Sequence, residues 1–356
     1  GFATELVELG VRGGRVALVC GNSIEMCIAL FALHAAGAQA VPINPIYTAR
    51  EMTHILKDSN PAAVIYDEES ANIVAPLLAE IGIANGILVG GKEGPLLDTW
   101  RNDESTTLPG PLPGPDDFAT LQYTGGTTGL PKGVNITHGQ MSVNISQREA
   151  VLPTRPDNET VICIMPLFHV FASSMCLHLT AYCRGRLVIL PRYHPAQVLS
   201  IIENEKITRL PAGPTVFNGL MGYEGFEGRD FSSLITAYSG SAPLPEETLK
   251  RWQELTGCPI LEGYGQSEAG PVLTYIGEGE EIRPGSVGKP IPETEVQIVD
   301  VETGNNILGP REQGEIRARG PQIMSGYRNR PEETAETLRD GWLYTGDIGE
   351  FDDDGD

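Results

Sequence analysis

Short apolar runs typical of β-strands alternate with longer amphipathic stretches through the first 280 residues. Ser23 is positioned to cap a helix that ends before Gly37, and Thr48 with Glu51 forms a capping-box pattern. This alternation predicts an α/β fold with two doubly wound sheets and flanking helices. We expect roughly residues 21–150 to form the first sheet, and residues 1–20 with 160–280 to form the second. The predicted strands are 15–20, 38–43, 62–66, 118–123, 161–164, 187–190, 207–210, 234–238 and 259–261.

The pattern changes after Glu278, where short strands and turns replace the helices. Strands predicted at 295–299, 314–318 and 341–344 indicate a small, β-rich, barrel-like subdomain over residues 281–356. Earlier in the chain, the proline- and glycine-rich segment 108–115 has too few apolar residues to pack and is typical of a stiff linker.

The segment 121–133 carries the strongest chemical signal. Its glycines allow the backbone to approach an anion closely, and its threonines and Lys132 supply donors. Successive amides of such a turn form an anion-binding nest, which predicts a polyphosphate ligand. The segment is not a Walker A loop, because Lys132 is followed by glycine. Thr137 is positioned to cap the helix that follows.

Two other loops follow predicted strands in the same way. Residues 240–243 come after the strand at 234–238, and residues 263–268 come after the strand at 259–261. Because ligands bind at the carboxyl ends of strands in open α/β sheets, we expect these loops and the phosphate loop to converge on one site.

Composition narrows the possible partners. The 356 residues carry a net charge of -22, which disfavours nucleic acid and anionic membranes as ligands. No long uncharged apolar run is present, so we expect a soluble globular protein without an integral membrane segment. The six cysteines lie mostly in apolar stretches and form no CxxC pair, which favours reduced core residues and a cytoplasmic location. The oligomeric state is not predicted.

Several motifs together resemble the adenylate-forming superfamily, which includes acyl-CoA synthetases, firefly-type luciferases and the adenylation domains of peptide synthetases. The phosphate loop resembles the family's own, with Gly125 where serine is usual, and the resemblance spans essentially the whole chain. The other matching segments are 166–169, 239–244, 263–268, 314–321, 326–327 and 344–347.

The resemblance implies ATP, Mg²⁺ and CoA as cofactor and co-substrates. It assigns Lys132 to the outer phosphates, Tyr264 to the adenine face, Asp347 to the ribose hydroxyls, and Thr128 with Glu268 to the metal. The implied nucleotide-binding residues are Thr124, Gly125, Gly126, Thr127, Thr128, Gly129, Lys132, Gly240, Ser241, Ala242, Glu262, Gly263, Tyr264, Gly265, Gln266, Ser267 and Asp347.

The resemblance also implies an acyl pocket with His169 at its mouth, near the substrate carboxylate. His169 follows an apolar run, so a buried core histidine is the alternative. Phe171 stands where phenolic-acid ligases often have tyrosine, which favours an apolar acyl group. The residues expected to line the pocket are His169, Phe171, Ser174, Ser239, Gly240, Gly263, Ala269, Gly270, Pro271 and Val272.

We therefore expect an acyl-CoA synthetase in which His169, Lys132 and Glu268 act in catalysis. Fatty acids are the favoured substrates, and coumarate-type aryl acids are the alternative. A luciferase-like oxygenase shares the same motifs and stays an alternative. A peptide-synthetase adenylation domain is less expected, because such a domain usually places an aspartate in the pocket and none is evident in this sequence. The resemblance further implies a C-terminal domain with a catalytic lysine, which this sequence does not contain. A nucleotide-binding module without catalysis is therefore the alternative of another class.

Overall fold

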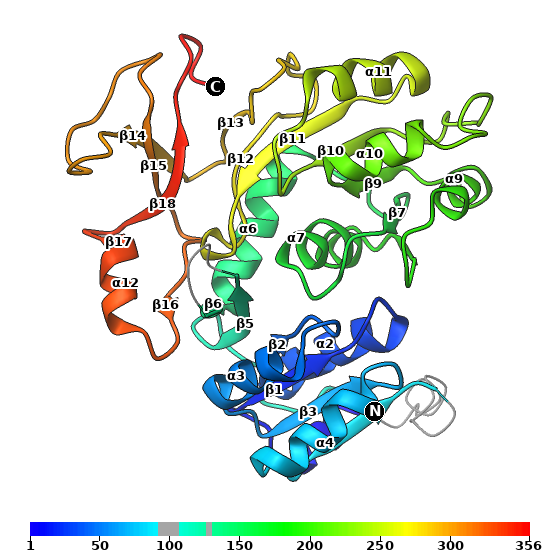
Figure 1. Cartoon of the computed structure of the whole chain (residues 1–356), viewed down its shortest axis with the longest axis vertical. Coiled ribbons are helices and arrows are strands. Elements are labelled where there is room, and N and C mark those ends of the chain that lie inside the picture. Colours follow the sequence, from blue (N-terminus) through cyan, green and yellow to red (C-terminus); the bar gives the residue numbers. More distant parts are fainter. Residues whose placement is uncertain (92–106, 126–129) are drawn as a thin grey trace. The chain divides into compact units, whose positions relative to one another are not determined.

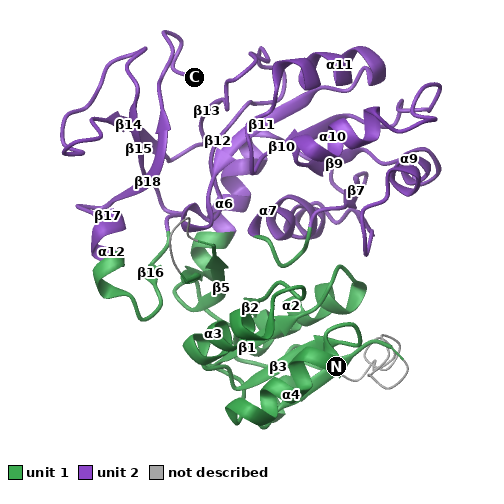
Figure 2. Cartoon of the chain, viewed as in Figure 1, with its two compact units in different colours: residues 1–141, 166–169, 324–333 green, residues 142–165, 170–323, 334–356 purple. Residues whose placement is uncertain are grey.

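The computed structural model describes residues 1–91, 107–125 and 130–356 (Figure 1). These residues form two compact units, coloured separately in Figure 2. Unit 1 contains residues 1–141, 166–169 and 324–333, and unit 2 contains residues 142–165, 170–323 and 334–356. Each unit is therefore assembled from separate stretches of the chain.

Unit 1 is built on a seven-stranded sheet with the order β16-β6-β5-β2-β1-β3-β4. The five strands from β5 to β4 are parallel, and β6 and β16 add antiparallel edges. Two helix pairs, α1 with α2 and α3 with α4, pack around the strands. The elements are α1 (Phe2–Glu8), β1 (Arg15–Val19), α2 (Ile24–Ala36), β2 (Gln39–Pro42), α3 (Ala49–Ser59), β3 (Ala63–Asp67), α4 (Ala71–Ile81), β4 (Gly86–Val89), β5 (Phe118–Thr124), β6 (Lys132–Thr137) and β16 (Gly326–Tyr327).

Strand β1 belongs to this first sheet, which corrects the expectation that residues 1–20 join the second. It pairs in parallel with β2 and β3, so that Val16 lies beside Ala40 and Ala63. The reason is local: β1, α2 and β2 form one β-α-β unit, and strands joined by so short a crossover usually neighbour each other.

Unit 2 contains a second seven-stranded sheet with the order β13-β12-β11-β10-β9-β7-β8. Its strands from β11 to β8 are parallel. Trp252 is buried in the hydrophobic core of this unit, and its ring centroid lies 5.0 Å from the ring centroid of Phe217. The elements are α6 (His138–Val151), β7 (Thr160–Cys163), α7 (Val170–Ala172), a π-helical turn (Ser173–His178), α8 (Leu179–Tyr182), β8 (Arg186–Ile189), α9 (Pro195–Asn204), β9 (Arg209–Ala212), α10 (Pro214–Met221), β10 (Thr236–Ser239), α11 (Glu246–Thr256), β11 (Ile260–Gly265), a 3₁₀ turn (Ser267–Ala269), β12 (Val272–Tyr275) and β13 (Lys289–Pro290).

The predicted β-rich segment forms a four-stranded antiparallel sheet with the order β14-β15-β18-β17. The two sheets that are mostly parallel and this antiparallel one confirm the predicted fold class. The boundary predicted at residue 280 stays a prediction. The elements are β14 (Glu295–Val299), β15 (Gly314–Arg319), α12 (Pro331–Thr337), β17 (Leu338–Arg339) and β18 (Trp342–Gly349).

The predicted helix caps are confirmed by their hydrogen bonds. The Met26 amide donates to Ser23 Oγ at 3.1 Å, and the Thr48 capping box is complete. Among the residues that the structure describes, no helix has both the length and the apolar character needed to cross a bilayer. None of the six cysteines, all of them described, takes part in a disulfide.

Candidate active site

The predicted phosphate loop connects two antiparallel strands of unit 1. Thr124 at the end of β5 pairs with Lys132 at the start of β6, and the Thr124 hydroxyl donates to the Lys132 carbonyl at 3.5 Å. Strand β6, which was not predicted, follows the loop, and α6 then begins at His138. The Gln140 amide donates to Thr137 Oγ1 at 3.2 Å, so the predicted Thr137 cap is confirmed.

Lys132 is held beside the loop by an aromatic ring. Its Nζ lies 4.3 Å from the centroid of the Tyr327 ring, and β16, which carries Tyr327, pairs with β6. This cation–π contact keeps a partly buried ammonium group near the loop. The predicted phosphate-binding residues Gly126, Thr127, Thr128 and Gly129 lie outside the described residues.

The other two predicted loops leave one edge of the unit 2 sheet. Strands β10 and β11 are parallel neighbours with Ser239 beside Glu262, and residues 240–243 follow the end of β10. Residues 263–265 were predicted as loop but continue β11, which pairs there with β12, so only residues 266–268 follow the strand. Ring packing requires glycine at two of these positions. A Cβ at Gly240 would lie 2.9 Å from the Phe171 ring, and a Cβ at Gly263 would overlap the Tyr275 ring.

The residues assigned to adenine and ribose are directly bonded within unit 2. The Tyr264 hydroxyl donates to Asp347 Oδ2 at 2.7 Å. Asp347 is exposed, whereas Tyr264 is half-buried. Burial, opposed by a hydrogen bond with Thr345 and aided by Asp347, raises the pKa of Tyr264, so the phenol remains a donor at neutral pH.

Glu262 lies in β11, beside Ser239 of β10, and is buried. One oxygen accepts a hydrogen bond from the Leu244 amide at 3.1 Å. Burial nevertheless raises the pKa of Glu262 to about 7, so near neutral pH the protonated and ionised forms of this carboxyl group are both populated. Six residues further on, Glu268 is buried on the 3₁₀ turn that follows β11.

Most residues predicted to line the acyl pocket belong to unit 2. Phe171 and Ser174 lie on the helical segment with a π turn, a feature often found at functional sites. Ser239, Ala269, Pro271 and Val272 are buried. The predicted ligand contacts of Ser241, Ala242, Gly265, Gln266, Ser267 and Gly270, on the two loops of the same edge, stay predictions.

His169 lies in unit 1, in a short loop between two stretches of unit 2. Its side chain is exposed, so the alternative of a buried core histidine is wrong. Desolvation by the surrounding protein lowers its pKa, which keeps the imidazole neutral at pH 7. A neutral imidazole near the carboxylate would donate or accept a hydrogen bond without adding charge.

Three buried residues near this site were missed by sequence reasoning. Asn144 Nδ2 donates to the Val272 carbonyl at 3.0 Å and its Oδ1 accepts from the Val272 amide at 3.2 Å. Arg148, one turn later on α6, and Tyr275, at the end of β12, are also buried. The only sequence signal is the polar spacing of Asn144, Gln147 and Arg148, which is equally typical of a solvated helix face.

The donor set predicted for Mg²⁺ is chemically suitable. Mg²⁺ prefers oxygen ligands and is commonly held by one or two carboxylates together with substrate phosphates. Glu268 supplies a carboxylate from a short turn, and the second predicted ligand, Thr128, lies outside the described residues. The residues therefore fit a metal that phosphate oxygens would share.

Known proteins resemble this chain along nearly its full length. A family profile described as AMP-binding enzyme matches residues 1–328. Long-chain-fatty-acid–CoA ligase of Bacillus subtilis strain 168 is 33% identical over 374 residues, covering 97% of this chain and 67% of the relative. 4-Coumarate–CoA ligase 1 of Oryza sativa subsp. japonica is 31% identical over 373 residues, covering 99% and 65%.

Solved structures agree with this grouping. ATP-bound MatB from Rhodopseudomonas palustris matches with a TM-score of 0.91 at 29% identity, covering 99% of this chain and 70% of that chain. The sequence motifs, the two sheets that are mostly parallel and the family match all point the same way. The chain belongs to the family of AMP-binding enzymes, and its relatives there include acid–CoA ligases.

Proposed function

We propose that the protein is an AMP-forming acid–CoA ligase that activates a carboxylic acid with ATP. The observation that carries this proposal is the bond between Tyr264 and Asp347, residues far apart in sequence that the motifs assign to adenine and ribose. The family match and the names of the relatives support the same activity, and the ATP in the MatB structure supports ATP as the nucleotide.

The first step needs no protein base, because the substrate carboxylate is already ionised at neutral pH. A carboxylate oxygen attacks the α-phosphorus of ATP, the bond to the bridging oxygen breaks, and pyrophosphate leaves with the acyl adenylate as product. The protein contributes positioning and charge neutralisation. In this proposal Lys132 faces the outer phosphates, Tyr264 stacks on adenine, and Asp347 accepts from the ribose hydroxyls.

The second step transfers the acyl group to CoA. The CoA sulfur attacks the acyl carbonyl, the carbon–oxygen bond to AMP breaks, and the thiol proton is released to solvent. His169, neutral because its pKa is lowered, would lie by the substrate carboxylate in both steps. Glu268 and Thr128 would hold Mg²⁺, which when bound neutralises phosphate charge.

Apolar acids are the substrate class that Phe171 supports next to the reacting carbonyl. Its ring packs against Gly240 and offers no hydroxyl to a phenol. Fatty acids are therefore proposed first, as for the Bacillus subtilis relative, and aryl acids second, as for the rice relative. The cytoplasmic location predicted from the cysteines stays a prediction.

A coupled assay tests this proposal directly. Full-length protein is incubated with ATP, Mg²⁺ and a panel of aliphatic and aromatic acids, and pyrophosphate, AMP and thioester are measured separately. We expect acid-dependent pyrophosphate release without CoA and thioester formation with it. Nucleotide binding without pyrophosphate release for any acid would favour the non-catalytic binding module instead.

A further inference from the structure

Arg148 is a buried cation of unit 2, and no carboxylate of the described residues forms an ion pair with it. The residue is 1% exposed, and its Nη1 donates to the carbonyl and the hydroxyl of Ser174, each at 2.8 Å. Among the described residues, none provides a hydrogen-bond acceptor for Nε or Nη2. Glu149 Oε1 accepts hydrogen bonds from the amide and hydroxyl of Thr154, and the Glu149 carboxylate acts on Arg148 electrostatically without a hydrogen bond between them among the described residues.

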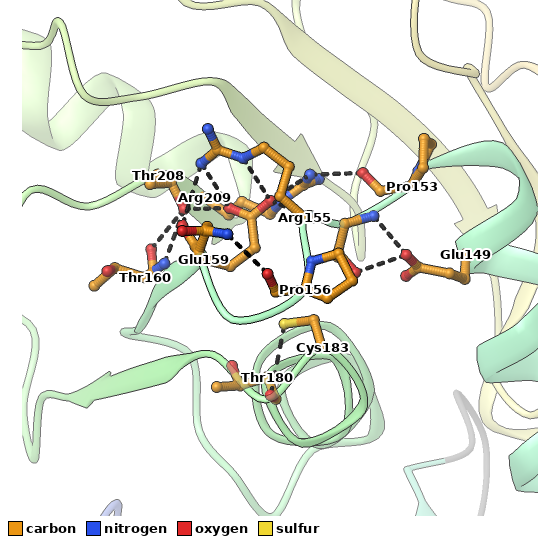
Figure 3. A network of polar contacts seen from close by, with 12 residues as sticks. Glu149, Pro153, Arg155, Pro156, Glu159, Thr160, Thr180, Cys183, Thr208 and Arg209 are labelled. Carbon is orange, nitrogen blue, oxygen red and sulfur yellow. Dashed lines mark hydrogen bonds and ion pairs between the residues drawn. The ribbon is translucent and has the colours of Figure 1, made fainter.

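Another buried arginine of the same unit has a carboxylate partner. Arg209 Nη2 lies 2.9 Å from Glu159 Oε1, and its Nη1 contacts the Tyr238 hydroxyl. Figure 3 shows this network, in which Glu159 also accepts from Arg155 and Thr208. Arg209 Nε also lacks an acceptor among the described residues, so the two arginines differ in the ion pair. A buried charge is costly unless it is paired, and the described residues give Arg148 no such pair, which indicates room for an additional acceptor.

The Tyr275 hydroxyl is a second donor without a hydrogen-bond partner among the described residues, and Tyr275 interacts electrostatically with Arg148. The hydroxyl is buried. The field of Arg148 acts on the Tyr275 phenol, and the Tyr238 ring lies edge-on at 6.1 Å. The guanidinium and the phenol together therefore provide donors for one acceptor group.

Both residues border the proposed acyl pocket. Arg148 is bonded to Ser174, and the Tyr275 ring packs on Gly263; Ser174 and Gly263 are both predicted pocket residues. Phe171, one helical turn before Ser174, packs on Gly240 and forms an apolar part of the same lining. The lining is thus apolar at Phe171 and rich in unsatisfied donors at Arg148 and Tyr275.

We propose that Arg148 and Tyr275 form a specificity subsite for a second acceptor group on the acid, with a second carboxylate as the best match. This inference rests on the proposed function. A carboxylate would accept from both free guanidinium nitrogens and from the phenol, which are the strongest hydrogen bonds available to it. A fatty acid without a second acceptor group would leave these donors unpaired, so among the apolar acids of the proposed function the subsite favours those whose chain carries such a group.

Matched pairs of acids test the subsite. We would measure kcat/KM of full-length protein for monocarboxylic acids, and for the dicarboxylic and terminal hydroxy acids of the same chain length, across a series of lengths. We expect a dicarboxylic acid of one length range to exceed its monocarboxylic partner by about tenfold or more. In Arg148→Met that preference should be lost, mainly through a lower kcat/KM for the dicarboxylic acid. Tyr275→Phe keeps the ring on Gly263 and should lower the preference by a smaller factor.

The controls separate the possible failures. Arg251→Met, at an exposed arginine of α11, should leave the preference unchanged. If Arg148→Met does not fold, the comparison of acids in the unmodified protein and in Tyr275→Phe still decides the matter. Activation of monocarboxylic acids with no gain from a second carboxylate at any length would overturn the subsite and leave the ligase activity standing. Activation of no acid at all would overturn both the subsite and the proposed function.

Discussion

The Tyr264 hydroxyl and the Asp347 carboxylate are joined by a hydrogen bond of 2.7 Å. Tyr264 lies near the end of β11, where this strand pairs antiparallel with β12, and Asp347 lies in β18 of the antiparallel sheet. The bond therefore ties the proposed adenine-binding loop to the proposed ribose ligand. Because Asp347 is exposed and Tyr264 is half-buried, the bond fixes the carboxylate near the surface, where a nucleotide can reach it.

Removing this hydroxyl should weaken nucleotide binding modestly. Tyr264→Phe keeps the ring for stacking and releases Asp347, and the loss of one such bond corresponds to about fivefold weaker binding of an acyl-adenylate analogue. Tyr264→Leu, which also removes the ring, should weaken it further. Isothermal titration calorimetry measures both variants. Equal affinity of Tyr264→Phe and the unmodified protein would show that the Tyr264 hydroxyl does not position Asp347 for the nucleotide.

Lys132 should discriminate between nucleotides by their phosphates. Lys132→Ala removes a cation from the proposed outer-phosphate site, so ATP binding should weaken by about tenfold or more. AMP binding should change little, because AMP lacks those phosphates. Lys250→Ala, at an exposed lysine paired with Glu246, is the matched control. An equal loss for ATP and AMP would place Lys132 elsewhere.

Glu268 should set the Mg²⁺ requirement of adenylation. Glu268→Gln keeps the shape of the side chain and removes its charge, so half-maximal pyrophosphate release should need several times more Mg²⁺. Glu254→Gln, at an exposed position of α11, controls for the general loss of one negative charge. The measurement is a Mg²⁺ titration of the adenylation rate at saturating ATP. An unchanged titration curve in Glu268→Gln would remove it from the list of ligands.

Glu262 should make stability depend on pH in the weakly acidic range. Its pKa is raised from 4.5 to about 7 by burial, so the folded protein retains a proton that the unfolded chain has already released. This contribution to stability is fully present below about pH 4.5 and is lost as pH rises through about 7. Glu262→Gln lacks the titration, and its free energy of unfolding relative to the unmodified protein should rise across that interval.

Urea unfolding of both proteins at a series of pH values measures this difference. The comparison between the two proteins cancels the titration of the other groups, provided that these are not coupled to Glu262. Parallel pH profiles would show that Glu262 ionises normally in the folded state.

Local signals made part of the fold predictable. The caps at Ser23, Thr48 and Thr137 were predictable because a cap depends on residues only three positions apart. Strand β6 was missed because its apolar residues are few, and because its pairing with β16 joins segments far apart in sequence. The predicted sheet membership of β1 was wrong because composition does not show which strands pair, although the short crossover to β2 favours neighbouring strands.

The site was predictable where a short motif carries it. The neighbouring ends of β10 and β11 followed from the alternation of strands and helices. Arg148 and Tyr275 could not be predicted, because a polar residue on a helix or a tyrosine ending a strand gives no sign of burial. Their unsatisfied donors become visible only when every neighbouring side chain is in place.

The chain passes from one unit to the other after residues 141, 165, 169, 323 and 333. Division of the chain at any one position therefore cannot separate one whole unit from the other. Recombination between homologous genes at one point would pair part of a unit with a foreign complement, unless the exchange fell near an end. Each unit also needs late segments of the chain, since β16 completes the first sheet only after most of the protein has been synthesised. An exchange of sequence with a homologue, natural or engineered, therefore keeps each unit intact only when it transfers both units together.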